Sequence, residues 1–381
     1  MLNQNINDEV TYNTIIIGAG IAGCSVAYFL QAQGENLLVV DRSGMVASGG
    51  SGAAGAFVSP KIGKGSPLQR LTNEAYNFAK EFYTNNFSEY FHQTGVIRIP
   101  KDAEDAEKFA EYESHNDTMY QKITQEQLDL LGINGYDSFL FDEAGVCDAS
   151  KLCEALLSNI SYIQYDVKNI EFIDELWHVG AYRSKNIVLA TGHENHLFDM
   201  RYMGIKGTWG SRGDYRSALK LDISMHKNIS VSANIDGIIK IGATHVKSNE
   251  PCLLCRGEPL GELFTKASNM IDTDDFELLE TYCGMRSGSK DYFPLVGELI
   301  DVAEMFKTYP KITSGAKVSK PFKKINNLYV CNGLGGRGFV FGPLMGKILA
   351  DCIVNKKEVD PRVNPDRLFL KWCRKSKELQ R

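Results

Sequence analysis

Three glycines and one acid near the start of the chain have the types and spacing of a site for a dinucleotide. The glycines follow the pattern G-x-G-x-x-G in Gly18-Ala19-Gly20-Ile21-Ala22-Gly23, and Asp41 follows with Arg42 beside it. Gly18 permits a tight turn, Gly20 lets the backbone approach a pyrophosphate, and Gly23 lets a helix pack on a sheet. Asp41 stands close to the roughly 20-residue distance expected of a carboxylate that binds a ribose hydroxyl.

These residues need a strand, a helix and a second strand to position them. A β-branched run precedes Gly18, an amphipathic segment continues to Gln33, and a second apolar run covers 36–40. This order predicts one βαβ unit whose helix begins at the phosphates, with unpaired N–H groups and a positive dipole end. The alternative is a glycine turn that only packs.

The composition is that of an ordinary globular protein. The chain has 381 residues, enough for two or three packed units, and a formal net charge of -5. A negative chain is no general polyanion binder, so any nucleic-acid contact must be a local patch. Scattered cysteines, a polar N-terminal segment and the lack of a long apolar run predict a cytoplasmic protein without a membrane span. The pair Cys252 and Cys255 lacks partners at zinc-site spacing, so free thiols are favoured over a metal.

Three later segments are predicted to return to the same dinucleotide. A small-residue run over 48–56 follows the ribose-binding acid, and we expect it to be a wall of the site, the alternative being a flexible loop. A buried strand over 186–190 ends at a tight turn, and another over 328–332 leads into a glycine run and a helix predicted from Gly342-Pro343 to Ile353. The candidate binding residues are Ser48, Ser51, Gly52, Ala54, Gly55, Val167, Thr191, Gly192, Gly333, Leu334, Gly335, Gly336, Arg337, Gly338 and Phe339.

The segments between these predict a second, inserted domain. Helical spacing is found over 68–91, 102–112, 124–131, 150–157 and 262–271, whereas 96–99, 229–233 and 237–243 read as strands. The fold class is therefore α/β, with a Rossmann-like domain of the glutathione-reductase type and a mainly antiparallel α+β substrate domain. We expect 1–90, 145–200 and 325–381 in the first domain, and 91–144 and 201–324 in the second.

Taken together, these motifs resemble the D-amino-acid-oxidase-like FAD oxidoreductases, a family that includes glycine oxidase and sarcosine oxidase. The resemblance covers nearly the whole chain. Within the family the chain is most similar to the FAD-dependent module of the bacterial enzymes that modify the wobble uridine of tRNA. The stretches that carry this are 51–56 with Pro60, Gly284-Met285-Arg286 onward to Gly297, and 333–338.

The resemblance implies FAD as cofactor and tRNA as substrate. A hydride would pass from the glycine-like methylene of carboxymethylaminomethyl-uridine to the flavin, and hydrolysis would give aminomethyl-uridine and glyoxylate. The related enzymes carry a methyltransferase domain before this module, whereas here the fingerprint begins at Gly18. We therefore expect a separate S-adenosylmethionine-dependent methyltransferase as partner. Thr191 also departs from the asparagine usual at that position.

Four residues are candidates for the chemistry. Arg286 and Arg337 are suited to hold the substrate carboxylate through an arginine fork, the alternative being a structural ion pair with an acid such as Asp291. His193 is a candidate base for the ammonium form of the substrate, unless it only makes local hydrogen bonds. Tyr292 could line the substrate face or belong to the core.

Two groups of basic residues are candidates for contacts with tRNA phosphates. One group is Lys371, Arg374, Lys375, Lys377 and Arg381, and the other is Arg201, Lys206, Arg212 and Arg216. Ordinary solvated charge is the alternative. Two other functions also stay open: a small-molecule oxidase of glycine, sarcosine or a D-amino acid, and a non-catalytic flavoprotein that binds tRNA or a methyltransferase.

Overall fold

The first of two large sheets carries the glycine fingerprint. The computed structural model describes residues 11–194, 196–247, 258–375 and 379. The first sheet runs in the order β9, β2, β1, β12, β19 and β18, with a β10–β11 hairpin on the first half of β12. Its strands are β1 Thr11–Ile17, β2 Leu37–Asp41, β9 Ser161–Gln164, β10 Glu171–Ile173, β11 Leu176–Val179, β12 Tyr182–Leu189, β18 Leu295–Ile300 and β19 Lys324–Asn332.

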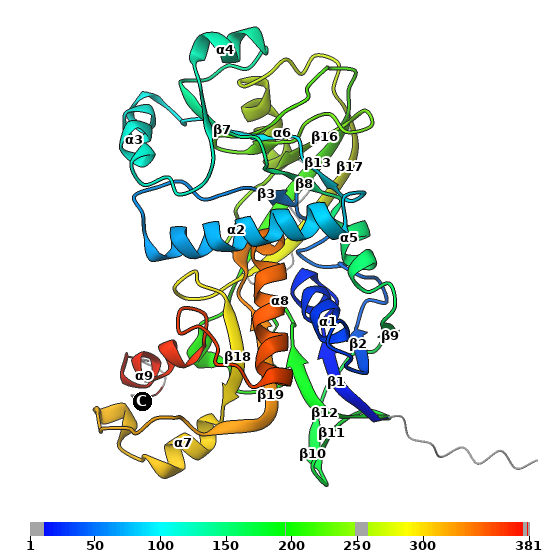
Figure 1. The fold of residues 1–381 in the computed structure, drawn as a ribbon, viewed down its shortest axis with the longest axis vertical. Helices are drawn as coiled ribbons and strands as arrows, with labels where there is room; N and C mark the ends of the chain where they lie inside the picture. The colour runs from blue at the N-terminus through cyan, green and yellow to red at the C-terminus, as the bar shows by residue number, and fades with distance from the viewer. Residues whose placement is uncertain (1–10, 195, 248–257, 376–378, 380–381) are drawn as a thin grey trace, which may run out of the picture.

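Both faces of this sheet are buried, which explains its continuous apolar strands. Ile16 and Val39 belong to one core, while their neighbours Ile15 and Leu38 belong to the other. In Figure 1, α1 and α8 lie side by side, α1 against β1 and β2 and α8 against β18 and β19. The helices of this half are α1 Ile21–Gln31, α2 Pro67–Asn86, α5 Ala149–Leu156, α7 Val302–Thr308, α8 Gly338–Asn355 and α9 Asp366–Lys375.

The helix predicted from Gly342 begins earlier, at Gly338, and contains Pro343. A proline inside a helix leaves the carbonyl four residues before it without its usual donor. Here that carbonyl belongs to Phe339, and the buried Tyr83 hydroxyl of α2 donates to it over 2.9 Å. The side chain of a neighbouring helix thus replaces the missing hydrogen bond, which a local sequence pattern cannot reveal.

The second large sheet lies at the other end of the molecule (Figure 1). It runs in the order β17, β13, β16, β15, β14, β5, β7 and β6, and β5 and β14 are its parallel pair. Its elements are β5 Val96–Arg98, α3 Ala103–Glu113, β6 Gln121–Ile123, α4 Gln125–Leu130, β7 Ser138–Phe141, β13 Lys206–Arg216, β14 Ser224–His226, β15 Ser230–Val231, β16 Ile238–Gly242, α6 Glu258–Ser268 and β17 Glu277–Gly288.

Alternation along these strands separates an apolar face from a polar one. Ile97, Met225 and Ile241 belong to a core that also includes residues of α6. Their neighbours Arg98, His226 and Lys240 therefore point to the opposite face. That polar face is the one turned toward the first sheet.

A small sheet and a crossing strand connect the two halves. The strands β3 Phe57–Val58, β8 Gly145–Cys147 and β4 Phe91–His92 form a three-stranded sheet. β18 pairs with β19 in the first sheet, so the expectation that the whole of 201–324 belongs to the second domain was wrong for this strand. Its sequence is apolar enough for either sheet, and only the pairing distinguishes them.

One described helical stretch, Gly335–Asn355, is long and apolar enough to cross a membrane by length and composition. It contains α8, whose Val340, Met345 and Leu349 are buried in the core beside α1 and α2. Its apolar character is accounted for by this packing.

Candidate functional site

A cavity of about 590 Å³ lies between the two large sheets. One end is lined by Asp41, Arg42 and Val167, and the other by Met285, Arg286 and Gly336. The cavity therefore extends from the end of β2 to the polar face of the second sheet. That length suits an extended dinucleotide with its reacting ring against the second sheet.

The fingerprint glycines are required by close backbone contacts. Gly18 has a φ of +109°, and a Cβ on it would overlap the carbonyl of Ala190. A Cβ on Gly23 would overlap the carbonyl of Gly18. These contacts bring α1 and the end of β12 against the same turn, so the helix start faces the cavity.

Side chains hold this turn in shape. One carboxylate oxygen of Asp41 accepts the N–H of Ala19 over 2.9 Å, and the other accepts both the N–H and the hydroxyl of Ser43. The Ser51 hydroxyl accepts the N–H of Ile21 over 2.9 Å at the first turn of α1. Asp41 and Ser51 thus preorganise the backbone that faces the cavity, in addition to lining it.

The small-residue run over 48–56 lies against β17 as well as against the cavity. A Cβ on Gly50 would lie 2.5 Å from the carbonyl oxygen of Met285, and a Cβ on Gly284 would lie 2.8 Å from the Cα of Gly50. Glycine is needed at both positions because two backbones touch there. The run is a packed wall, which excludes the alternative of a loose loop.

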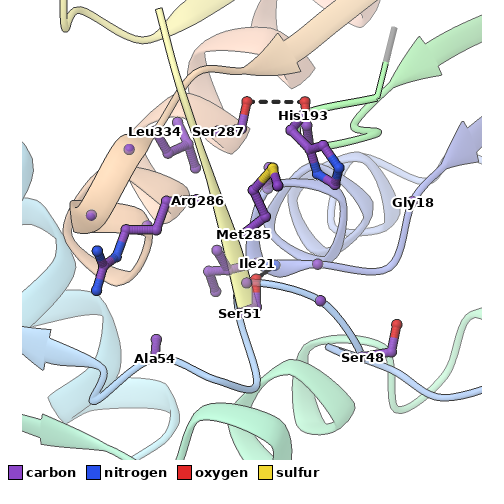
Figure 2. A pocket seen from close by; sticks show the side chains of 18 of the residues that line it. Gly18, Ile21, Ser48, Ser51, Ala54, His193, Met285, Arg286, Ser287 and Leu334 are labelled. Atoms are coloured by element: carbon purple, nitrogen blue, oxygen red, sulfur yellow. Dashed lines mark hydrogen bonds between the residues drawn. The ribbon is translucent and has the colours of Figure 1, made fainter. Parts of the chain in front are cut away.

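A hydrogen-bond network joins three segments that are far apart in the sequence. The Asn332 side-chain amide donates to the carbonyl of Gly192 over 2.7 Å and accepts the Ser287 hydroxyl over 2.8 Å. Ser287 also bonds the Gly192 carbonyl, as the dashed line in Figure 2 shows. The ends of β12, β17 and β19 are therefore fixed together at the cavity wall.

Arg286 reaches into the cavity without a carboxylate partner. Its Nη1 donates to the carbonyl of Thr244 over 3.0 Å and lies 3.4 Å from Nδ1 of His245. Among the described residues no carboxylate lies within ion-pair distance of it, and burial lowers its pKa. Gly210 on β13 makes room for the guanidinium, since a Cβ there would overlap it. In Figure 2 its side chain points away from Met285 and His193.

The alternative pairing of Arg286 with Asp291 is wrong. Asp291 accepts two hydrogen bonds from Arg367 of α9, each over 2.9 Å, and these bonds help to lower its pKa against the opposing effect of burial. Asp291 therefore anchors α9. Arg286 stays available for an acidic ligand.

Arg337 is placed differently from Arg286. Its Nη1 donates to the carbonyl of Ser59 over 3.2 Å, and it does not line the cavity. No described carboxylate forms an ion pair with it, and burial lowers its pKa to about 10. The alternative of a structural ion pair is therefore absent from the described part of the chain, and the role of Arg337 toward the substrate carboxylate stays a prediction. The two guanidinium groups are separate cationic centres.

His193 lines the cavity, whereas Tyr292 does not. Burial lowers the pKa of His193, and Arg42 adds to this while Glu194 opposes it. Tyr292 is 74% exposed and has a φ of +68°. It therefore lies neither on the substrate face nor in the core. The turn set by Asp291, which bonds Ser289 and the N–H of Phe293, directs Tyr292 outward.

Most of the predicted cofactor residues line the cavity. They are Gly18, Gly20, Ile21, Ala22, Asp41, Arg42, Ser48, Ser51, Ala54, Gly55, Val167, Thr191, Gly192, Leu334, Gly335, Gly336, Gly338 and Phe339. Ala19, Gly23, Gly52, Gly333 and Arg337 stand outside the lining. Gly52 is needed instead for packing, since a Cβ there would overlap the carbonyl of Ala47.

The polar face of the second sheet adds residues that the sequence reasoning missed. His226, Lys240 and His245 line the cavity there. Burial lowers the pKa of both histidines, most strongly for His226. The available signal was alternation, as in Ile239-Lys240-Ile241, where one polar residue interrupts an apolar strand.

Arg212 agrees with neither of its two interpretations, a contact with tRNA phosphates or ordinary solvated charge. It is 4% exposed, its guanidinium pairs with Asp214 over 2.7 Å, and it stacks over the Tyr282 ring. It also donates to the carbonyl of Ala54. Arg212 thus connects the second sheet to the wall over 48–56.

Three of the other basic residues in these two groups have partners within the protein. Arg201 and Arg216 pair with Asp199 and Glu277, each at less than 3.0 Å. Arg374 contacts the carbonyl of Ala316. Lys377, Arg381, Cys252 and Cys255 lie outside the described residues, so the predictions for them stay untested.

The residues present fit FAD. The cavity begins at backbone N–H groups of a helix start, where a pyrophosphate binds favourably, and passes an acid suited to a ribose. It then reaches a wall in which Gly335 and Gly336 leave the backbone open and in which Met285 and Phe339 supply apolar surface. A flat ring system fits between such walls.

Comparisons with known proteins agree with this geometry. The family model described as FAD dependent oxidoreductase matches residues 13–352. A Legionella pneumophila protein named tRNA 5-methylaminomethyl-2-thiouridine biosynthesis bifunctional protein MnmC is 25% identical over 94% of this chain and 57% of its own length. A Marinomonas protein of the same name is 23% identical over 99% of the chain and 62% of its own length. The chain thus spans less than two thirds of these relatives.

Solved structures show the same fold. Glycine oxidase from Bacillus cereus superposes with a TM-score of 0.76 at 19% identity, covering 91% of this chain and 96% of the other. L-proline dehydrogenase from P. horikoshii superposes with a TM-score of 0.70 at 16% identity, with 96% of each chain covered. The predicted fold class and the FAD cofactor are confirmed. The chain is an FAD-dependent enzyme and belongs to the FAD dependent oxidoreductase family.

Proposed function

We propose that this enzyme oxidises the carboxymethylaminomethyl group on the wobble uridine of tRNA, giving aminomethyl-uridine and glyoxylate. The observation that carries the proposal is Arg286, a half-buried arginine in the cavity lining without a carboxylate partner among the described residues. The names of the curated relatives supply the tRNA part of the proposal. The cytoplasm is the compartment in which we expect such a substrate.

Arg286 would position the substrate by its carboxylate. A guanidinium fork makes two parallel hydrogen bonds to a carboxylate, and such charge-assisted bonds contribute roughly 1.5–3 kcal/mol each. The hydrogen bond to the Thr244 carbonyl and the space above Gly210 hold the guanidinium in one orientation. The methylene beside the bound carboxylate is thereby fixed at one place against the cavity wall.

FAD supplies the acceptor for the hydride. The carbon–hydrogen bond of the methylene breaks as the nitrogen lone pair forms an imine, and the nitrogen proton leaves to solvent or to a base. Water then adds to the imine carbon, and cleavage of the carbon–nitrogen bond releases glyoxylate and the amine. The protein's own work is binding and orientation.

The cavity histidines favour the uncharged amine that this reaction needs. His193, His226 and His245 each have a lowered pKa, so they are neutral at neutral pH. A neutral imidazole can accept the proton of an ammonium substrate. Nδ1 of His245 faces Arg286, which can only donate, so the proton of this ring stands on Nε2. His193 and His226 are therefore the better candidate bases.

A methyltransferase is the expected partner. The relatives are named bifunctional for 5-methylaminomethyl-2-thiouridine biosynthesis, and the amine formed here lacks the methyl group of that product. We infer that an S-adenosylmethionine-dependent methyltransferase activity consumes it.

Oxidation of a free amino acid such as glycine or sarcosine is the second candidate function. Arg286 would hold such a carboxylate equally well, so the arginine alone does not separate the two substrates. The names of the curated relatives favour the tRNA substrate.

The test is mass spectrometry of wobble nucleosides from cells that lack this protein. We expect carboxymethylaminomethyl-uridine to accumulate, and its level to return to normal with the wild-type gene but not with Arg286→Ala. Unchanged wobble nucleosides in the deleted strain would contradict the proposal. Complementation by Arg286→Ala would contradict the role of this arginine.

A further inference from the structure

A second group of cations, separate from Arg286, gathers beside the cavity wall. Arg98 on β5 stands next to His226 on β14, since the two are register partners and Ile99 donates to the His226 carbonyl over 2.9 Å. On another element, Arg337 donates to the carbonyl of Ser59, two residues before Lys61. We call Lys61, Arg98 and Arg337 the cationic cluster.

The backbone around the cationic cluster is held firmly. The N–H and the carbonyl of Lys61 both bond the Asn73 side chain of α2, over 2.8 and 3.2 Å. Arg98 is in a paired strand between β14 and β7. Arg337 is fixed at the start of α8. Three separate elements thus present positive side chains beside the same cavity, because His226, the neighbour of Arg98, and Gly336 and Gly338, the neighbours of Arg337, all line it.

No carboxylate in the described part of the chain lies within ion-pair distance of the cationic cluster. None of its members forms an ion pair there, and the side chains of Lys61 and Arg98 make no hydrogen bond to a described residue. Burial and Arg337 lower the pKa of Arg98 by more than Asp105 raises it, and Asp105 makes no ion pair with Arg98. All three members are part-exposed, so an external group can reach them.

The charges also act on one another. Burial and the neighbouring Arg337 lower the pKa of Arg98 to about 9, and Arg337 and Arg98 add to the effect of burial on Lys61. Both arginines likewise add to the effect of burial on His226. Like charges held together without acids favour an incoming anion, because the anion removes both the repulsion and the unmet hydrogen bonds.

We propose that the cationic cluster binds a backbone phosphate of the substrate RNA, next to the nucleoside whose side group enters the cavity. This inference rests on the proposed function. Arginine forks match phosphate geometry as well as that of carboxylates. His226 belongs to the cavity lining and touches the strand of Arg98, so the phosphate site and the site of oxidation share one wall.

The alternatives account for the cluster less well. A free amino acid offers one carboxylate, and Arg286 already stands inside the cavity to meet it. A wobble nucleoside carries a phosphate on each side, and these must stay outside a cavity that admits only the base substituent. Inorganic phosphate or a small phosphorylated molecule shares the chemistry, and the test separates these sources.

The first arm of the test measures binding of an anticodon stem-loop to the FAD-loaded protein over a range of salt concentrations. We expect Arg98→Gln and Lys61→Gln each to weaken binding by roughly tenfold and to reduce the salt slope by about 0.7–0.9. The matched control is Lys64→Gln, which removes a nearby exposed lysine that pairs with Glu111. We expect the control to stay within about twofold of wild type.

The second arm locates the phosphate. Stem-loops with one uncharged methylphosphonate linkage, on either side of the wobble nucleoside, are bound to wild type and to Arg98→Gln. We expect one such linkage to weaken wild-type binding and to abolish the difference between the two proteins. The inference is overturned if Arg98→Gln loses the same affinity for stem-loops with native and with neutral linkages. It is also overturned if Arg98→Gln binds the native stem-loop as tightly as wild type does.

The third arm addresses small ions. If inorganic phosphate binds wild type but not Arg98→Gln while every methylphosphonate binds normally, the ligand is a free anion and the inference is overturned. Binding is measured without turnover in all arms. A protein that binds RNA through Arg98 but releases no glyoxylate would therefore disprove the proposed function and leave this inference standing.

Discussion

At the scale of single residues, the account depends on an arginine held in place by residues that never touch the substrate. Arg286 was found from its sequence context, but Gly210 was not. The role of Gly210 arises from the register of β13 on β17, where Thr208 faces Arg286 and Gly210 lies under its guanidinium. Cross-strand register is set by pairing over the whole sheet, so no local pattern reports it.

Substitution of Arg286 should act on substrate binding. Arg286→Ala removes a fork worth roughly 3–4 kcal/mol to the carboxylate, so we expect KM for the modified stem-loop to rise about 100-fold or more. Arg286→Lys keeps the charge without the fork, so its KM should lie between those of wild type and Arg286→Ala. The surface variant Arg216→Ala is the control, and glyoxylate release is the measurement. An unchanged KM in Arg286→Ala would exclude it as the carboxylate anchor.

His226 should make the folded state sensitive to acid. Its pKa in the folded protein lies well below the ordinary value of about 6.5, because of burial and then of Arg98, Arg337 and Lys101. The unfolded chain therefore binds the proton first as the pH falls. The contribution to stability is complete above about pH 6.5 and is lost below it, by at most about 1.4 kcal/mol per pH unit.

The check is the pH dependence of the unfolding free energy. His226→Asn keeps a polar group near Ser230, the partner of Nδ1, but cannot be protonated. We expect its free energy of unfolding to fall less steeply than that of wild type between pH 7 and about pH 5. Parallel curves would show that His226 is not held neutral by the fold.

At the scale of elements, the order of strands and helices followed largely from the sequence, whereas the start of α8 did not. The strands around Gly18 and the start of α2 fall where spacing predicts, whereas α2 ends at Asn86 rather than at 91. α8 begins four residues early because the Tyr83 hydroxyl replaces the hydrogen bond that Pro343 cannot make. A hydrogen bond between distant segments outweighs a local start signal there.

The contact between α1 and α8 depends on glycine. A Cβ on Gly346 would lie 2.7 Å from the carbonyl carbon of Ser25, which is backbone and cannot turn aside. We expect Gly346→Ala to lower the free energy of unfolding by about 1–3 kcal/mol, despite the better helix propensity of alanine.

The matched control for that packing is Gly261→Ala in α6, where nothing described lies within 4 Å of the added Cβ. At that position alanine should raise the free energy of unfolding by up to about 1 kcal/mol. Thermal unfolding of both variants gives the comparison. If Gly346→Ala were as stable as Gly261→Ala, the close approach of the two helices would be wrong.

At the scale of the whole molecule, Arg212 joins the second sheet to the wall of the FAD cavity. Its guanidinium bonds Asp214 within the second sheet and the carbonyl of Ala54 in the wall of the FAD cavity. The sequence grouped Arg212 with surface charges, because alternation within a strand fixes which residues share a face but not which face is covered. The opposing sheet decides that, and it becomes known only with the tertiary fold.

Loss of Arg212 should therefore weaken both stability and cofactor retention. Arg212→Met leaves the buried Asp214 carboxylate without its partner, which costs about 3–5 kcal/mol of unfolding free energy. Adding Asp214→Asn should restore part of that stability. Both the single variant and the double variant should retain less FAD than wild type through gel filtration, because both lack the contact with Ala54. Full FAD retention in Arg212→Met would contradict this connection.

The central claim is that Arg286 and the cationic cluster serve an RNA substrate. The direct measurement is anaerobic titration of the FAD-loaded protein with tRNA that carries carboxymethylaminomethyl-uridine, and separately with glycine and sarcosine. We predict loss of the oxidised flavin absorbance with the tRNA, together with one glyoxylate per flavin, and no change with either amino acid. Bleaching by glycine or sarcosine but not by the tRNA, or by none of them, would contradict the account.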